Sequence, residues 1–131
     1  MTATVEVATG DGRPPMSAAT AAGPIDRVHL SRYTLGNRDL ENEVLQLFAE
    51  QAPKYLEGLR SSANDKSWRE AAHTLKGSAL AVGAMRVAAA AERAELLDIG
   101  EGHAARESAV AAVAAAVDEA RRHVAALIGG A

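Results

Sequence analysis

The chain of 131 residues contains no cysteine and only four aromatic side chains. Without thiols there is no disulfide framework, no thiolate nucleophile and no thiolate metal site. A net charge of −3 and so few aromatic residues argue against the basic, aromatic surface of a nucleic-acid binder. The longest apolar run, 109–117, is too short to cross a bilayer, and the N-terminus lacks the features of a signal peptide. These absences predict a cytoplasmic, soluble protein of one domain that binds neither nucleic acid nor membrane.

The first 24 residues contain few large apolar side chains and three prolines, Pro14, Pro15 and Pro24. Because such a composition supplies little apolar surface to bury, residues 1–24 are predicted to be a disordered tail. Asp11-Gly12 resembles the glycine-rich part of an ATP site, but no strand or helix flanks it, so we expect no ATP site there. Residues 25–131 are predicted to form a single domain.

From Pro24 onward the apolar pattern is helical to the end, with no convincing strand. Asn37 is the predicted N-cap of the second helix, Asn64 or Asp65 caps the third, and Gly83 ends the third in a left-handed conformation. The expected helices run from about Ile25 to Tyr33, from Asn37 through Leu59, from Asn64 to Gly83, from Ala84 to Ile99 and from His103 to Ile128. Four long amphipathic helices with short connections favour an all-α fold, an antiparallel four-helix bundle with a short additional N-terminal helix covering one end.

Four of the five expected helices carry stripes that we expect to face the core, apolar except for Gln51 of the second helix. They are Ile25, Val28 and Leu30 in the first helix; Leu40, Val44, Leu47, Phe48, Gln51, Tyr55 and Leu59 in the second; Trp68, Ala71, Ala72, Leu75, Ala79 and Val82 in the third; and Val110, Val113, Val117, Ala120, Val124 and Leu127 in the fifth. Pro53 interrupts the second helix and is expected to kink it or to remove one backbone hydrogen bond. The many alanines of the third and fourth helices predict that these two helices pack closely.

The stretch from His73 to Gly77 places a histidine where a folding core has no use for one. At about 100° per residue, His73 lies roughly 200° from Leu75 of the apolar stripe and so faces away from the core. Lys76 and Gly77 follow at +3 and +4, so they share the exposed face with His73. An exposed imidazole beside a cation and a bare glycine is suited to carry an anion presented to another protein, and a phosphoryl group is the obvious candidate.

The residues around this histidine resemble the histidine phosphotransfer (HPt) family. The similarity lies in His73-Thr74-Leu75-Lys76-Gly77-Ser78, in Gly83 ten residues after the histidine, and in Ala88, Glu92 and Glu95. The segment from Leu35-Gly36-Asn37 through Phe48 to Trp68 is also similar to the family's second helix and connector. The resemblance covers about residues 25–100 and implies a helical bundle that serves as a phosphorelay intermediate.

By this resemblance His73 is the phosphoacceptor, which takes a phosphoryl group from a receiver-domain aspartate or a kinase and passes it to a response-regulator receiver. Lys76 is then the cation beside the phosphate, and Gly77 the gap that lets the partner approach. The family often has glutamine 22 residues after the histidine, whereas Glu95 stands here, as in the relatives found in chemotaxis kinases. We expect the neighbouring helix to bring Glu95 near His73, where it would accept a hydrogen bond from Nδ1–H and leave Nε2 free to attack.

Phosphoryl transfer depends on positioning and charge neutralisation more than on covalent help. A phosphohistidine carries about two negative charges near neutral pH, and Lys76 one helical turn away offsets part of that charge. We expect no resident cofactor, and Mg²⁺ is expected in the partner receiver domain because this chain shows no carboxylate cluster for it. Without a glycine-rich phosphate loop, the chain is expected to be a phosphotransfer intermediate with no ATP-dependent kinase activity of its own.

Two other classes of helical protein remain as alternatives. The dimerisation domain of a histidine kinase typically has an acidic residue directly after the histidine and a proline a few residues on, whereas Thr74 and Gly77 stand here. The second alternative is a non-catalytic helical adaptor in which His73 has no chemistry. An HPt-like protein is expected to be a monomer whose partners are response-regulator receiver domains and a hybrid or histidine kinase.

Overall fold

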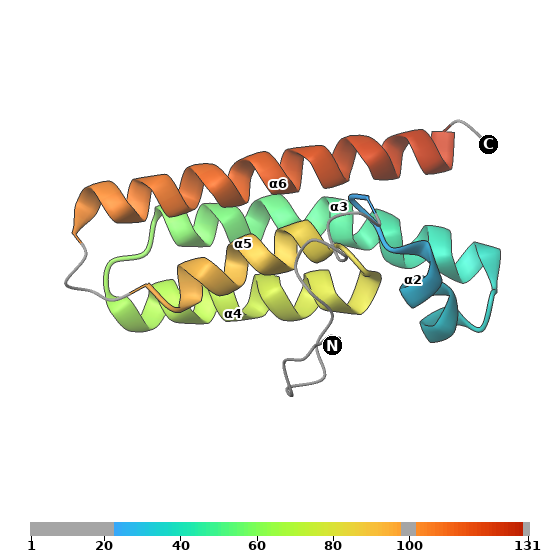
Figure 1. Ribbon diagram of the computed structural model, residues 1–131, viewed down its shortest axis with the longest axis horizontal. Helices are drawn as coiled ribbons and strands as arrows, with labels where there is room; N and C mark the ends of the chain where they lie inside the picture. Colours follow the sequence, from blue (N-terminus) through green and yellow to red (C-terminus); the bar gives the residue numbers. More distant parts are fainter. Residues whose placement is uncertain (1–22, 98–101, 130–131) are drawn as a thin grey trace, which may run out of the picture.

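The computed structural model describes residues 23–97 and 102–129, which fold into five helices (Figure 1). In chain order they are α2 (Arg27–Thr34), α3 (Arg38–Arg60), α4 (Asp65–Val82), α5 (Met85–Glu95) and α6 (His103–Gly129). The four long helices form a bundle in which α3 and α5 each pack against both α4 and α6, while α2 contacts α3 and α4 at one end. No strand occurs within the described residues, and the predicted all-α four-helix bundle is confirmed.

Parts of the predicted chain organisation lie outside the described residues. The tail up to residue 22, with Asp11-Gly12, is among them, and so is Ile99, the predicted end of the fourth helix. Within the described part, that helix ends earlier than predicted, at Glu95, where the Leu97 N–H donates to the Ala94 carbonyl three residues back at 3.2 Å, a tighter turn than that of an α-helix.

The short helix α2 begins two residues later than predicted. Its N-cap is Asp26, whose side chain accepts hydrogen bonds from the backbone N–H groups of Val28 and His29, at 3.1 Å each. Ile25 and Leu30 are buried as predicted, but Val28 is exposed, so its assignment to the core was wrong.

Gly83, which follows α4, is required by the fold for two reasons. Its φ of 79° is left-handed, a conformation in which an L side chain is strained. A Cβ at this position would also lie 2.7 Å from the carbonyl oxygen of Asp26, whose N–H donates to the Gly83 carbonyl at 2.8 Å. The backbone at Asp26, just before α2, therefore lies directly against the turn between α4 and α5. This contact places α2 beside α4.

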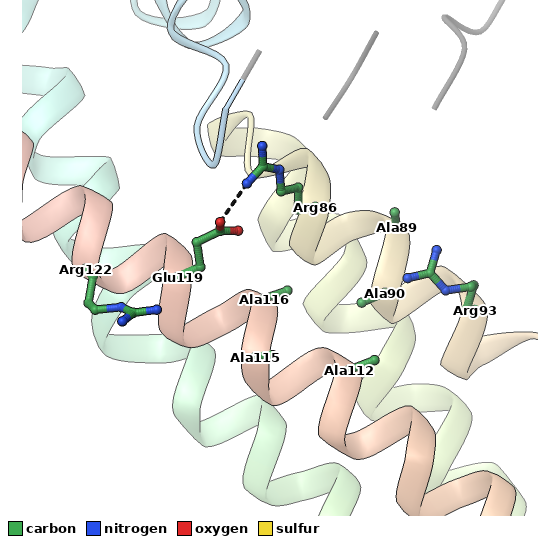
Figure 2. Close-up of a pocket in the computed structure, with 9 residues that line it drawn as sticks. All are labelled: Arg86, Ala89, Ala90, Arg93, Ala112, Ala115, Ala116, Glu119 and Arg122. Carbon is green, nitrogen blue, oxygen red and sulfur yellow. Dashed lines mark hydrogen bonds and ion pairs between the residues drawn. The ribbon is translucent and has the colours of Figure 1, made fainter. Parts of the chain in front are cut away.

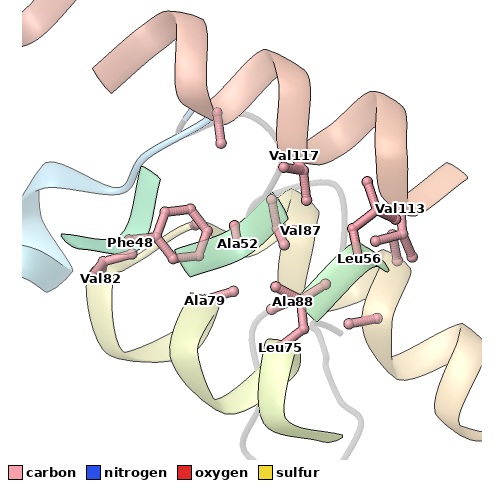
Figure 3. Packing of buried hydrophobic residues seen from close by; sticks show 14 of the residues in the cluster. Phe48, Ala52, Leu56, Leu75, Ala79, Val82, Val87, Ala88, Val113 and Val117 are labelled. Atoms are coloured by element: carbon pink, nitrogen blue, oxygen red, sulfur yellow. The ribbon is translucent and has the colours of Figure 1, made fainter. Parts of the chain in front are cut away.

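Small side chains bring α4 and α5 close together, as their alanine content predicts. Most of the buried positions of α5 are alanine, from Ala88 to Ala91 and at Ala94, and α4 also has buried alanines, at Ala72 and Ala79. Larger side chains fill the space between the other helices, including Phe48, Leu75 and Val113 (Figure 3). This packing fixes the separation of α4 and α5, the two helices that carry the predicted site residues.

The predicted apolar stripe of α3 was wrong by about one residue around the helix. Leu47 has 55% of its surface exposed and Leu40 is also exposed. The buried face consists of Glu41, Leu45, Phe48, Ala52, Leu56 and Leu59. The sequence did not indicate this face because Glu41 lies on it, and a carboxylate is expected to be exposed unless it has polar partners. The structure supplies them, since Thr34 Oγ1 donates to Glu41 Oε2 at 2.9 Å and Arg27 lies 3.5 Å from Oε1.

Pro53 lies within α3, and the helix continues through it. Because proline has no N–H, the carbonyl of Ala49 lacks its usual partner four residues on. Arg121 of α6 donates from Nε to this carbonyl at 3.0 Å. A side chain of the neighbouring helix thus replaces the hydrogen bond that proline removes, and it ties α6 to α3.

We expect Arg121→Met to lower the free energy of unfolding by about 1 kcal/mol, because it keeps an aliphatic stem but leaves the Ala49 carbonyl without its donor. The cost should shrink in a Pro53→Ala background, where residue 53 regains its N–H. Chemical denaturation of the two single variants and the double variant measures this coupling. Arg122→Met is the matched control, since Arg122 pairs with Asp118 on its own helix at 3.3 Å. Equal effects of Arg121→Met in both backgrounds would contradict the proposed link.

Candidate functional site

His73 stands in the middle of α4 on its solvent face, with 69% of its side chain exposed. The neighbouring positions Ala72 and Leu75 are fully buried, so α4 is held in the bundle by the side opposite His73. The exposed placement follows the helical periodicity. An imidazole in this position is accessible to a second protein without any movement of the bundle.

Glu95, the last residue of α5, joins the two polar side chains of this face. Its Oε2 lies 2.8 Å from His73 Nδ1, and its Oε1 lies 3.1 Å from Lys76 Nζ. All three groups therefore meet although they come from two helices. The structure brings together three of the four predicted site residues in direct contact.

The Glu95 side chain is mostly buried, with 21% of its surface exposed. This burial alone would raise the pKa of Glu95, but the hydrogen bonds from Lys76 and then His73, with the charge of Lys76, outweigh it and leave the pKa below its usual value. Glu95 is therefore ionised at neutral pH and acts only as a hydrogen-bond acceptor. It follows that Nδ1 of a neutral His73 carries the proton and that the lone pair is on Nε2.

Lys76 is not a free cation in this state of the protein. Only 26% of its side chain is exposed, and its ammonium group is paired with Glu95. The charges of Lys76 and Glu95 cancel locally, so the unphosphorylated site is close to neutral. The predicted position of Lys76 beside the histidine is observed, whereas its ion pair was not predicted.

Gly77 faces open space. A Cβ built at this position would have no neighbour within 4 Å in the described part of the chain outside its chain neighbours and its own helix backbone, and its φ is not left-handed. Packing among the described residues therefore gives no reason for glycine here. The gap lies one turn beyond His73 on the exposed face of α4.

The exposed residues on the two sides of His73 along α4 differ in polarity. Lys66 and Arg69 are exposed on the N-terminal side of the histidine, and Leu80 is exposed on the C-terminal side. At helical spacing these residues project in nearly the same direction as His73. His29 of α2 lies with Nε2 2.8 Å from the Leu80 carbonyl, which sets α2 next to this apolar end. Leu80 was missed in the sequence because it falls outside the core stripe, and its exposure is visible only once the helices are packed.

A separate groove of about 400 Å³ lies between α5 and α6 (Figure 2). Its floor is made of alanines from both helices, and Arg86 at its edge points toward Glu119 at 2.6 Å. None of the predicted site residues lines it. In the part of the chain that the structure describes, no group of three or more side chains is arranged to hold a metal ion. The chemistry that can be assigned is therefore that of the His73, Lys76 and Glu95 cluster.

The site thus consists of an exposed histidine on a bundle of four long helices, with its Nδ1 in contact with a carboxylate of the next helix. Residues 43–126 match the Hpt domain family, and the chain belongs to this family. Comparison with curated proteins and with solved structures found no match. Membership gives the chain a histidine phosphotransfer role in phosphorelays, in which Hpt domains interact with receiver domains and kinases. Among the described helices, none is long and apolar enough to span a membrane.

Proposed function

We propose that His73 is the phosphoacceptor and that it exchanges a phosphoryl group with a receiver-domain aspartate. The observation that carries this proposal is the 2.8 Å contact between Nδ1 and Glu95. The carboxylate holds the proton on Nδ1, so the lone pair is on Nε2 and is directed at solvent. There it can attack the phosphoryl group of an approaching partner protein. An adaptor without chemistry would have no need for this arrangement.

The transfer step follows from the same geometry. Nε2 attacks the phosphorus of an aspartyl phosphate, the N–P bond forms, and the P–O bond to the aspartate breaks with its electron pair returning to the carboxylate. Because Nδ1 keeps its proton, the ring of the product carries a positive charge, which the Glu95 carboxylate stabilises. In the reverse direction the neutral ring leaves as the receiver aspartate attacks.

Lys76 has a second role in this scheme. In the unphosphorylated site its ammonium pairs with Glu95. Once a phosphoryl group with about two negative charges is bound, Lys76 can share its remaining protons with the phosphoryl oxygens. The added charge is thus partly neutralised without the entry of a new cation.

The expected partners are response-regulator receiver domains and a hybrid or histidine kinase, and the chain is proposed to act as a monomer. We propose that the partner receiver binds the Mg²⁺ ion used in transfer and that this chain has no cofactor of its own. The face that a receiver would contact has Gly77 and Leu80 on one side of His73 and Arg69 on the other. This arrangement supports an apolar contact beside Leu80 and an electrostatic contact with the acidic phosphorylation pocket of a receiver beside Arg69.

Incubation of the purified chain with phosphorylated receivers of the source organism tests the proposal. We expect label to move to this chain in an acid-labile, base-stable linkage, as expected for phosphohistidine. A profile against all receivers and hybrid kinases also identifies the cognate partners and the direction of flow. If no receiver and no kinase labels the chain, the proposed function is wrong.

We expect Glu95→Leu to slow single-turnover transfer by at least about tenfold, because it removes a charge-assisted hydrogen-bond acceptor from Nδ1. Glu95→Gln should stay within about threefold of wild type, since an amide oxygen accepts the same bond. The measurement is the rate of label transfer from a phosphorylated receiver, with circular dichroism as the control for helix content. A Leu variant that is as fast as wild type would show that Glu95 does not orient His73.

A further inference from the structure

Trp68 is the only tryptophan of the chain, and it is buried on the core side of α4. Its indole Nε1 donates a hydrogen bond to the carbonyl oxygen of Ala94 at 2.7 Å. Ala94 directly precedes Glu95, the residue that contacts His73 and Lys76. The indole is thus bonded to the peptide unit from which the Glu95 carboxylate extends.

The Ala94 carbonyl lies in the last turn of α5 and accepts more than one hydrogen bond. The backbone N–H of Leu97 donates to it at 3.2 Å, and the Trp68 indole adds a shorter hydrogen bond from another helix at 2.7 Å. The indole therefore ties this turn of α5 to α4.

The indole ring is in turn held from the other side of the bundle. The Arg106 guanidinium of α6 lies 5.0 Å from the centre of the Trp68 ring, and it pairs with Asp65 of α4 at 3.5 Å. A cation over the ring face and the burial of the ring in the core restrain the orientation of the indole. The direction of its N–H is restrained with it.

We propose that Trp68 is a positioning residue for the phosphotransfer site, acting through Ala94 to place Glu95. The contacts form a closed loop between two helices: Trp68 of α4 holds the end of α5, and Glu95 at that end returns to His73 and Lys76 of α4. Without the indole N–H, the last turn of α5 becomes more mobile. Glu95 then contacts His73 and Lys76 in a smaller fraction of the molecules. This inference rests on the proposed role of His73 as phosphoacceptor.

Trp68→Phe keeps a buried aromatic ring and removes the N–H. We expect transfer from a phosphorylated receiver to slow by about fivefold, the factor that corresponds to one hydrogen bond of ordinary strength. The ¹⁵N signals of the His73 ring should shift from those of the Nδ1–H form toward a mixture of the two tautomers. Phe48→Leu is the matched control, since it disturbs the core on α3 and should lower stability without changing the His73 signals.

A double-mutant cycle separates positioning from general destabilisation. In a Glu95→Leu background, Trp68→Phe should slow transfer no further, because the group that Trp68 places is already absent. The same slowing in both backgrounds, or a Trp68→Phe variant with wild-type His73 signals and rate, would overturn the inference. If the Phe variant does not fold, benzothienylalanine at position 68 has the shape of tryptophan without the N–H and takes its place. If the wild-type protein accepts no label, the proposed function is wrong. The ¹⁵N signals of the His73 ring, compared between wild type and Trp68→Phe, still decide whether Trp68 positions Glu95.

Discussion

His73→Gln is expected to abolish phosphoryl acceptance completely while the domain folds as stably as wild type. The imidazole is largely exposed and makes its side-chain contact with Glu95 alone among the described residues, so little packing is lost. A glutamine amide nitrogen has no available lone pair comparable to Nε2, so it does not form the phosphoryl linkage. The measurement is label retained on the purified variant after incubation with a phosphorylated receiver, together with thermal unfolding.

Two other described histidines, His29 and His103, provide the controls for this experiment. His29 contacts the Leu80 carbonyl through Nε2, and His103 pairs with Glu107 at 3.1 Å on the surface of α6. His29→Gln and His103→Gln should both keep the full label. A parallel incubation with ATP alone should label none of the proteins, because no phosphate-binding loop is present in the sequence. Label on the His73→Gln variant, or label from ATP alone, would contradict the proposed mechanism.

Local chemistry explains why the helix order was predictable from the sequence. Asn37 and Asn64 act as N-caps, accepting from Leu40 N–H at 3.0 Å and Ser67 N–H at 2.8 Å, and Gly83 ends α4 in the left-handed conformation. Each signal depends on a few neighbouring residues, so it can be recognised without the fold. The face of His73 was predictable for the same reason, because it follows from the period of one helix.

The errors in prediction arose where distant residues decide the outcome. Glu41 is buried because Thr34 and Arg27 of another helix satisfy its carboxylate, and this shifted the true core face of α3. The end of α5 accepts a hydrogen bond at the Ala94 carbonyl from Trp68, which lies 26 residues earlier. No pattern within a single helix contains such information.

The candidate site combines both kinds of information. His73, Lys76 and Gly77 lie within one helix and could be placed from spacing alone. The contact of Glu95 with His73 was expected only from the resemblance and from the closeness of the two helices, and the ion pair of Glu95 with Lys76 was not expected. A side-chain contact between helices depends on their separation and rotation, which the packed alanines of α4 and α5 fix only in the folded domain.

Gly77→Gln is expected to fold better than wild type and yet to transfer about a hundredfold more slowly, the penalty typical of a misplaced reacting pair. Glycine inside a helix costs about 1 kcal/mol relative to a good helix former, so the variant should gain stability of that order. Among the described residues, and apart from its chain neighbours and its own helix backbone, a Cβ here meets no atom within 4 Å, so the added side chain extends into the space where a partner would dock. Stability is measured by chemical denaturation, and transfer by single-turnover label exchange with a phosphorylated receiver.

Two further variants make this experiment decisive. Gly77→Ala adds one methyl group and should give an intermediate loss of rate, since a steric effect grows with the size of the side chain. Ala111→Gln places the same long side chain on an exposed position of α6 and should leave transfer unchanged. If Gly77→Gln unfolds, the glycine serves a packing role that the open space around it does not reveal. Transfer at the wild-type rate would instead show that partners do not approach Gly77 closely enough to meet an added side chain. The docking face would then have to lie on the other side of His73, beside Arg69.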